Sequence, residues 1–75
     1  MKRIYEVEYE EKWPGCEWVS SSIKVAGNGN ALDAVAKTRK YVLGLTYENE
    51  ENNRIERCKG FRLLGISLVA QADIW

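Results

Sequence analysis

Hydrophobic and polar residues alternate with a period of two near the N-terminus. Over residues 3–11, Tyr5, Val7 and Tyr9 fall on one face of an extended chain, whereas Ile4 and three glutamates fall on the other. This alternation is typical of an antiparallel strand with one buried face and one solvated face. The first segment is therefore predicted to be a half-buried strand.

A turn and a second alternating segment follow. Pro14 fixes φ at one turn position, and Gly15 tolerates a positive φ at the next. Over residues 16–26 apolar residues again occupy every second position towards the end of the segment, with Ile23 and Val25 on one face. The two segments are therefore predicted to pair as a hairpin.

The next segment has the helical period instead. Over Ala31–Leu43 the small or apolar residues, Ala34 and Val42 among them, recur every three or four positions, and lysines lie opposite. Asn30 is a favourable N-cap, and Gly44 is a natural stop for the helix. The glycine-rich turn before Asn30 lacks the third glycine of a dinucleotide-binding loop, so we interpret it as a turn and a cap.

The chain after the helix is predicted to form a loop and one or two strands. Residues 46–53 are polar and acidic, which favours an exposed loop. A short strand over residues 54–58 and a tight turn at Lys59 and Gly60 are then expected before a long strand that begins at Phe61.

The long final strand is apolar on both of its faces. We expect its core-facing row to run unbroken through Leu64, Ile66, Leu68, Ala70, Ala72 and Ile74. Leu63, Val69 and Trp75 are expected on the reverse face, and Gly65 is expected to mark either a β-bulge or a close approach by another backbone.

These elements predict one α+β domain over residues 1–75. The expected order is strand, strand, helix, an optional short strand, and strand. The helix is expected to pack on one face of an antiparallel sheet of three strands, or of four if the short strand joins it. A right-handed crossover would place the last strand beside the first, so that the first becomes central.

Composition narrows the classes of function. Eleven basic and eleven acidic side chains give no net charge, which weakens the case for nucleic acid because that affinity depends on a basic surface. No apolar run approaches the ~18 residues of a membrane helix, and the acidic N-terminus does not resemble a signal peptide. We therefore expect a cytoplasmic protein without a membrane partner.

The residues of common catalytic and metal sites are scarce. The chain has no histidine and two cysteines, Cys16 and Cys58, too few for a tetrahedral zinc site within one chain. Without an export signal both cysteines are expected to be free thiols. The serines at positions 20–22 have no histidine to activate them. We expect no enzyme activity, no cofactor and no metal.

Two functional alternatives remain open from the sequence. The helix covers one face of the sheet, so the other face is expected to display apolar side chains to a protein partner, most simply a second copy of the chain. The expected interface residues are Ile4, Trp18, Leu63, Val69 and Trp75.

The alternative is a nucleic-acid-binding regulator. Basic residues on the helix and around the start of the last strand would contact phosphates, and a nearby aromatic would stack on bases. The expected contacts are Lys37, Lys40, Arg54, Arg57, Lys59 and Arg62.

Overall fold

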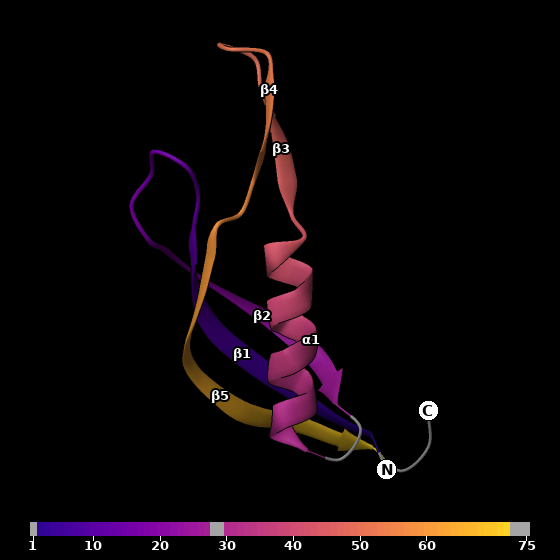
Figure 1. Ribbon diagram of the computed structural model, residues 1–75. Coiled ribbons are helices and arrows are strands. Elements are labelled where there is room, and N and C mark those ends of the chain that lie inside the picture. The colour runs from indigo at the N-terminus through magenta and orange to yellow at the C-terminus, as the bar shows by residue number, and fades with distance from the viewer. Residues whose placement is uncertain (1, 28–29, 73–75) are drawn as a thin grey trace.

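One helix and five strands make up the fold in the computed structural model, which describes residues 2–27 and 30–72, with the side chains of residues 3–27 and 30–70 (Figure 1). The elements are β1 (Lys2–Lys12), β2 (Val19–Gly27), α1 (Ala31–Leu43), β3 (Thr46–Asn49), β4 (Arg54–Arg57) and β5 (Gly60–Ala72). The predicted α+β class is confirmed.

The main sheet has three antiparallel strands in the order β2-β1-β5. Strand β1 is central, and its Val7 lies opposite Ile23 of β2 and Ile66 of β5. The predicted hairpin and the crossover that brings the last strand beside the first are therefore confirmed. Because β1 is central, both β2 and β5 form edges of this sheet.

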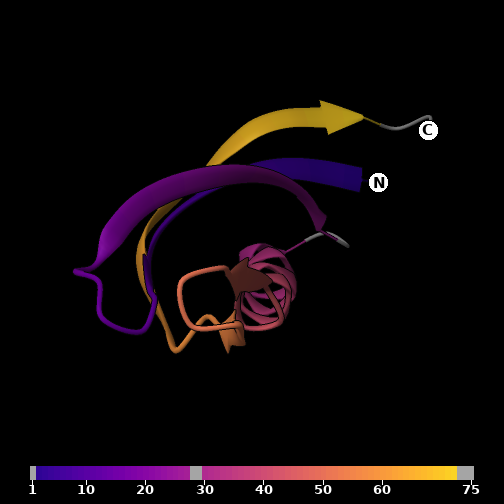
Figure 2. The same ribbon diagram turned by 90° about the horizontal axis from the view of Figure 1, so that it is seen from above.

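The sheet bends around the helix, which lies on its concave side (Figure 2). The buried core joins the inward row of β1 to one face of the helix. Its buried residues are Tyr5, Val7, Tyr9, Ala34, Thr38, Val42 and Cys58. Thr38 satisfies its hydroxyl within the helix by donating to the Ala34 carbonyl at 2.8 Å, so a polar residue is accommodated among apolar neighbours.

The helix begins where the sequence predicts, at a cap made by Asn30. The Asn30 Oδ1 accepts a hydrogen bond from the Asp33 N–H at 2.7 Å. Replacing Asn30 with alanine leaves this N–H without its partner, so the free energy of unfolding is expected to fall by about 1 kcal/mol. Urea denaturation measures the loss, and Asn30→Ser, which keeps a capping oxygen, is the control. Equal stability of Asn30→Ala and the wild type would contradict this role.

The predicted loop after the helix is wrong over residues 46–49, whereas residues 50–53 do form an exposed turn. Thr46–Asn49 is strand β3, which pairs with β4 as a separate two-stranded hairpin. The Tyr47 hydroxyl and the Asn49 amide both donate to the Glu56 carboxylate, at 3.3 and 3.0 Å. Polar cross-strand pairs hold this hairpin, which extends beyond the sheet (Figure 1), and the sequence therefore shows no apolar alternation there.

The tight turn expected at Lys59 and Gly60 is also wrong. The chain passes from β4 into β5 without a reversal, and the Lys59 N–H donates to the Lys12 carbonyl at 2.7 Å. Gly60 serves a close approach instead, because a Cβ there would lie 2.8 Å from the Trp18 ring.

Two bulges interrupt the pairing of β5 with β1. Register shifts occur between Ile4 and Tyr5 and between Glu8 and Tyr9 of β1. At the second shift Gly65 lies opposite Glu8 and Leu63 opposite Tyr9, which confirms the first of the two alternatives expected at Gly65, a bulge.

The bulges change which residues of β5 share a face. The expected unbroken row is wrong, because each bulge adds one residue and moves the alternation by one position. Leu64 lines an open hollow with Glu8 and Ser22 on the convex side. Leu63, which was expected on the reverse face, lies opposite the buried Tyr9 and therefore on the concave side.

Candidate interaction surface

The convex face of the sheet has no helix across it (Figure 2). Its middle strand presents alternating glutamates, and β2 presents serines and Lys24 opposite them. Lys24 lies opposite Glu6, and Ser22 lies opposite Glu8. Apart from Ile4 and Ala26 at one end, the convex face is thus polar over β1 and β2, and its large apolar side chains concentrate on β5.

Strand β5 keeps large apolar side chains exposed on both of its faces. Leu63 and Leu68 lie opposite Tyr9 and Tyr5 on the concave side, yet they are 44% and 52% exposed. On the convex side Leu64 is 52% exposed, and Val69 at the second bulge is 47% exposed. We call Leu63, Leu64, Leu68 and Val69 the β5 surface.

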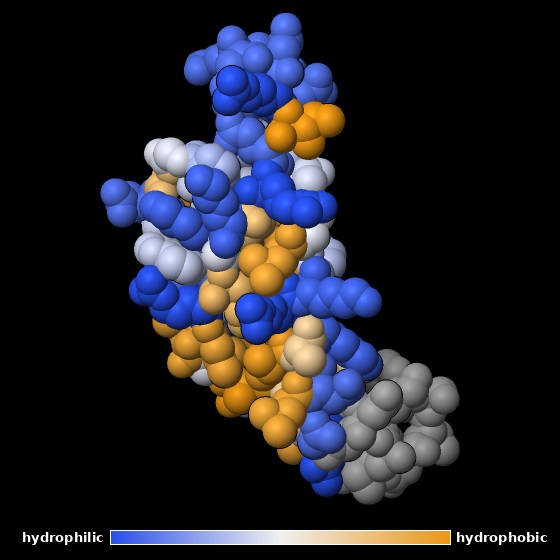
Figure 3. Space-filling view, in the orientation of Figure 1, coloured by the Kyte–Doolittle hydropathy of each residue, from blue (hydrophilic) through white to orange (hydrophobic). Residues whose placement is uncertain are grey.

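The hydropathy of the molecular surface likewise places the apolar area on β5. In the view of Figure 3 the hydrophobic surface gathers over β5 and the adjoining part of α1, whereas the projecting β3–β4 hairpin is mostly hydrophilic. Exposed apolar surface of this extent on one element is typical of a contact surface.

The residues expected at a protein interface do not all lie together. Ile4 pairs with Ala70, next to Val69, so this pair shares one end of the sheet. Leu63 belongs to the concave side, and Trp75 lies outside the described residues. Leu64 and Leu68 were expected in the core-facing row of the last strand, so their exposure was not predicted. Gly65 within the apolar run was the signal of a bulge that could have revealed it.

Trp18 is held by contacts within the chain. The guanidinium carbon of Arg62 lies 3.9 Å from the centroid of its ring, and Arg62 also forms an ion pair with Glu10 at 3.5 Å between Nη1 and Oε1. The ring also lies against Gly60, where a Cβ would come within 2.8 Å of it. Trp18 is therefore half-buried and already has a cationic partner.

The basic residues expected to bind nucleic acid divide into separate groups. Lys37 pairs with Asp33 at 3.2 Å and donates to the Ala26 carbonyl at 3.1 Å. Lys40 is exposed on the helix. Arg62 is committed to Trp18 and Glu10, as described above.

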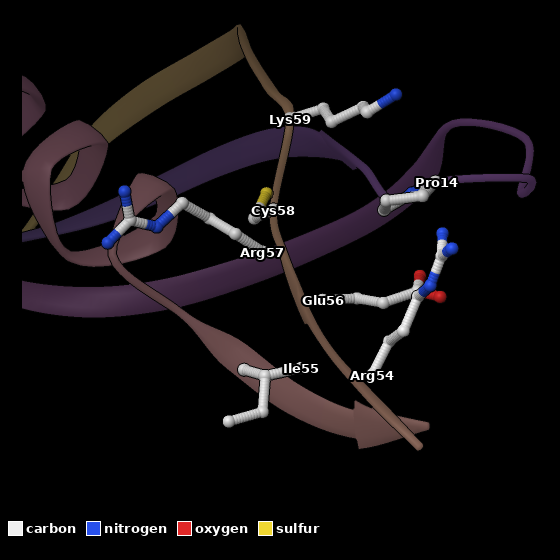
Figure 4. Close-up of a pocket in the computed structure, with 7 residues that line it drawn as sticks. All are labelled: Pro14, Arg54, Ile55, Glu56, Arg57, Cys58 and Lys59. Carbon is white, nitrogen blue, oxygen red and sulfur yellow. The ribbon is translucent and has the colours of Figure 1, made fainter. Parts of the chain in front are cut away.

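Three further cations surround one hollow beside β4. Arg54, Arg57 and Lys59 line it together with Pro14 and Glu56 (Figure 4). Arg57 extends to one side of the strand, and the charged ends of Arg54 and Lys59 extend to the other (Figure 4). The three charges therefore do not converge on a single point.

The titratable groups of the core serve packing. The Cys58 thiol donates to the Lys12 and Gly60 carbonyls at 3.6 and 3.4 Å, and the thiols of Cys16 and Cys58 are both free, as the sequence predicted. Burial raises the pKa of Tyr9, and the nearby Glu11 carboxylate raises it further. Within the residues that the structure describes, no group of three or more metal-ligating side chains forms.

The described part of the chain contains no helix with the length and apolarity needed to cross a membrane. Comparisons with protein-family models, curated proteins and solved structures found no match to this chain. The function therefore has to be inferred from the surface itself.

Proposed function

We propose that this protein is a non-enzymatic interaction module that works as a homodimer joined along the β5 surface. The observation that carries the proposal is the exposure of large apolar side chains on both faces of one edge strand, of which Leu64 and Leu68 are each 52% exposed. A second copy would cover them and remove this apolar area from water, which stabilises the pair.

The size of the molecular surface supports a partner. The chain exposes 5418 Å², whereas a monomer of its mass exposes about 4,700 Å² by the usual scaling. Part of the excess is the surface of the projecting β3–β4 hairpin (Figure 1), and the whole excess is of the same order as the roughly 800 Å² that each partner buries in a standard interface. The radius of gyration is 14.5 Å, compared with about 11 Å for a compact chain of this length.

Charge favours a second copy as that partner. The chain carries no net charge, so two copies approach without overall repulsion. No acidic or basic residue occurs from position 63 to position 72 of β5. Two β5 strands would therefore meet without placing like charges together.

The basic residues give less support to a nucleic-acid partner. Lys37 and Arg62 are in ion pairs with carboxylates of the same chain. Arg54, Arg57 and Lys59 share their hollow with Glu56. Neutralisation of phosphates, on which such binding depends, would need several unpaired cations on one surface.

The oligomeric state in solution tests the proposal. Light scattering over a range of concentrations is expected to give twice the chain mass of 8.6 kDa, with dissociation on dilution. The midpoint of thermal unfolding should rise with concentration, because dimerisation stabilises the folded chain by mass action. A constant monomer mass at the highest concentration would overturn the proposal.

A further inference from the structure

Apart from its two bulges, the edge formed by β5 lacks the side chains that usually protect an edge against strand pairing. Edge strands present unpaired backbone N–H and C=O groups, and proteins commonly shield them with lysine, proline or other charges. In the described residues β5 pairs with β1 alone, and no charge or proline occurs from position 63 to 72. The opposite edge differs. Strand β2 carries Lys24, and the Lys37 ammonium donates a hydrogen bond to the backbone carbonyl of Ala26 on this strand.

The two bulges of β5 are arranged symmetrically along the strand. Leu64 is the unpaired residue of the first bulge, between Leu63 and Gly65, and Val69 is the unpaired residue of the second, between Leu68 and Ala70. The centre between Leu64 and Val69 falls between Ile66 and Ser67, so a two-fold axis through either of these residues would bring the bulges of two copies close together.

From this symmetry we infer that two copies of β5 pair antiparallel about a two-fold axis at Ser67. The inference rests on the proposed homodimer and adds its geometry. The result is a continuous six-stranded sheet in which the bulge at Leu64 and Gly65 of each copy faces the bulge at Val69 and Ala70 of the other.

The register about Ser67 matches the two faces of the sheet. Residues directly opposite each other in an antiparallel pair share a face. This axis places Ile66 opposite the partner's Leu68, both on the concave side. It places Leu64 opposite the partner's Ala70 on the convex side. An axis at Ile66 would instead oppose Leu68 to Leu64, which lie on different faces because of the bulge.

The same axis continues the two layers of the monomer, the sheet and the helix on its concave side, across the dimer. A two-fold axis perpendicular to the sheet keeps both helices on the concave side, and the interface is isologous. Leu63 and Leu68 then gain cover on the concave side, and Leu64 and Val69 gain it on the convex side. One contact therefore accounts for exposure on both faces of the strand.

A cysteine placed on the proposed axis tests this arrangement. Ser67→Cys is made together with Cys16→Ser, since Cys16 is the exposed native thiol. Opposed Cα atoms in an antiparallel pair lie about 4.5–5.5 Å apart, within the roughly 4.4–6.8 Å range of disulfides. Under mild oxidation the two thiols, one from each copy, lose two electrons and two protons to the added oxidant, such as oxidised glutathione, and form one S–S bond.

The matched control is Ser22→Cys in the same background. Ser22 and Ser67 are both exposed on the convex face, but Ser22 lies on the opposite edge of the sheet. Non-reducing gels are expected to show covalent dimers of Ser67→Cys forming at least about tenfold faster than those of Ser22→Cys, because the first pair reacts within a preformed dimer.

The outcomes separate the inference from the proposal beneath it. A dimer mass with faster cross-linking at position 67 supports the paired strands. A dimer mass with equal cross-linking at both positions overturns the strand pairing and leaves the homodimer standing. A monomer mass with no preference overturns both.

Discussion

Replacing Tyr9 with alanine is expected to lower the free energy of unfolding by about 3–5 kcal/mol, as for other large aromatic residues removed from a core. Tyr9 is 5% exposed in the central strand, and its ring stacks on that of Phe61 with centroids 5.5 Å apart. A chain of this length has about 4–11 kcal/mol of stability in total. The variant should therefore be marginally folded in urea titrations.

The control for this variant is Tyr9→Phe, which keeps the ring and its stacking but removes the hydroxyl. It also isolates an effect of pH. Burial raises the pKa of Tyr9 above its usual value of 10.0, so the unfolded chain loses this proton at a lower pH than the folded chain. Stability therefore falls as the pH rises above about 10, and this fall should be smaller in Tyr9→Phe. Equal destabilisation by Tyr9→Phe and Tyr9→Ala at neutral pH would contradict the packing role.

The helix and the first hairpin were predictable because local patterns determine them. Helical spacing, the Asn30 cap and the stop at Gly44 lie within one short segment, and the observed helix has the predicted bounds Ala31–Leu43. The alternation of β1 is equally local, and one buried face fixes its register. Both predictions needed little knowledge of the rest of the chain.

The projecting hairpin could not be predicted on the same basis. Strands β3 and β4 have no buried face: Ile55 is 78% exposed, and the stabilising contacts of Glu56 join residues from different strands. Asn53 adopts a φ of 54° in the connecting turn, which asparagine tolerates. A strand without a buried face needs no regular alternation of apolar and polar residues, so the sequence pattern cannot reveal it.

The candidate surface was predicted in outline but not in detail. The sequence predicted apolar residues on both faces of the last strand, and Ile4 lies opposite Ala70, the neighbour of Val69. The position of Leu63 depends on a bulge that forms only against Glu8 and Tyr9 of a distant strand. The partnership of Trp18 with Arg62 likewise joins a loop to β5, and neither contact leaves a local pattern.

Charging the convex part of the β5 surface is expected to dissociate the homodimer. The double variant Leu64→Lys, Val69→Lys replaces two half-exposed apolar side chains. Each side chain is about half covered in the single chain, so the dimer gains about 0.75 kcal/mol from burying it, and the two copies contribute four such side chains. Their loss, about 3 kcal/mol in total, corresponds to a dissociation constant about 100-fold higher. In the proposed pairing, Leu64 of one copy lies beside the partner's Val69, so the introduced ammonium groups would also repel each other.

The matched control for this variant is Ser20→Lys, Ser22→Lys, which places the same charges at exposed positions of the convex face on the β2 edge. Sedimentation equilibrium measures the dissociation constants, and far-UV circular dichroism checks that both variants keep the fold. Because the control leaves the β5 edge unchanged, its dissociation constant should stay within about threefold of the wild type, as expected for small surface effects. Equal weakening by both double variants would mean that charge anywhere on the sheet opposes association, and the β5 surface would then have no special part in it.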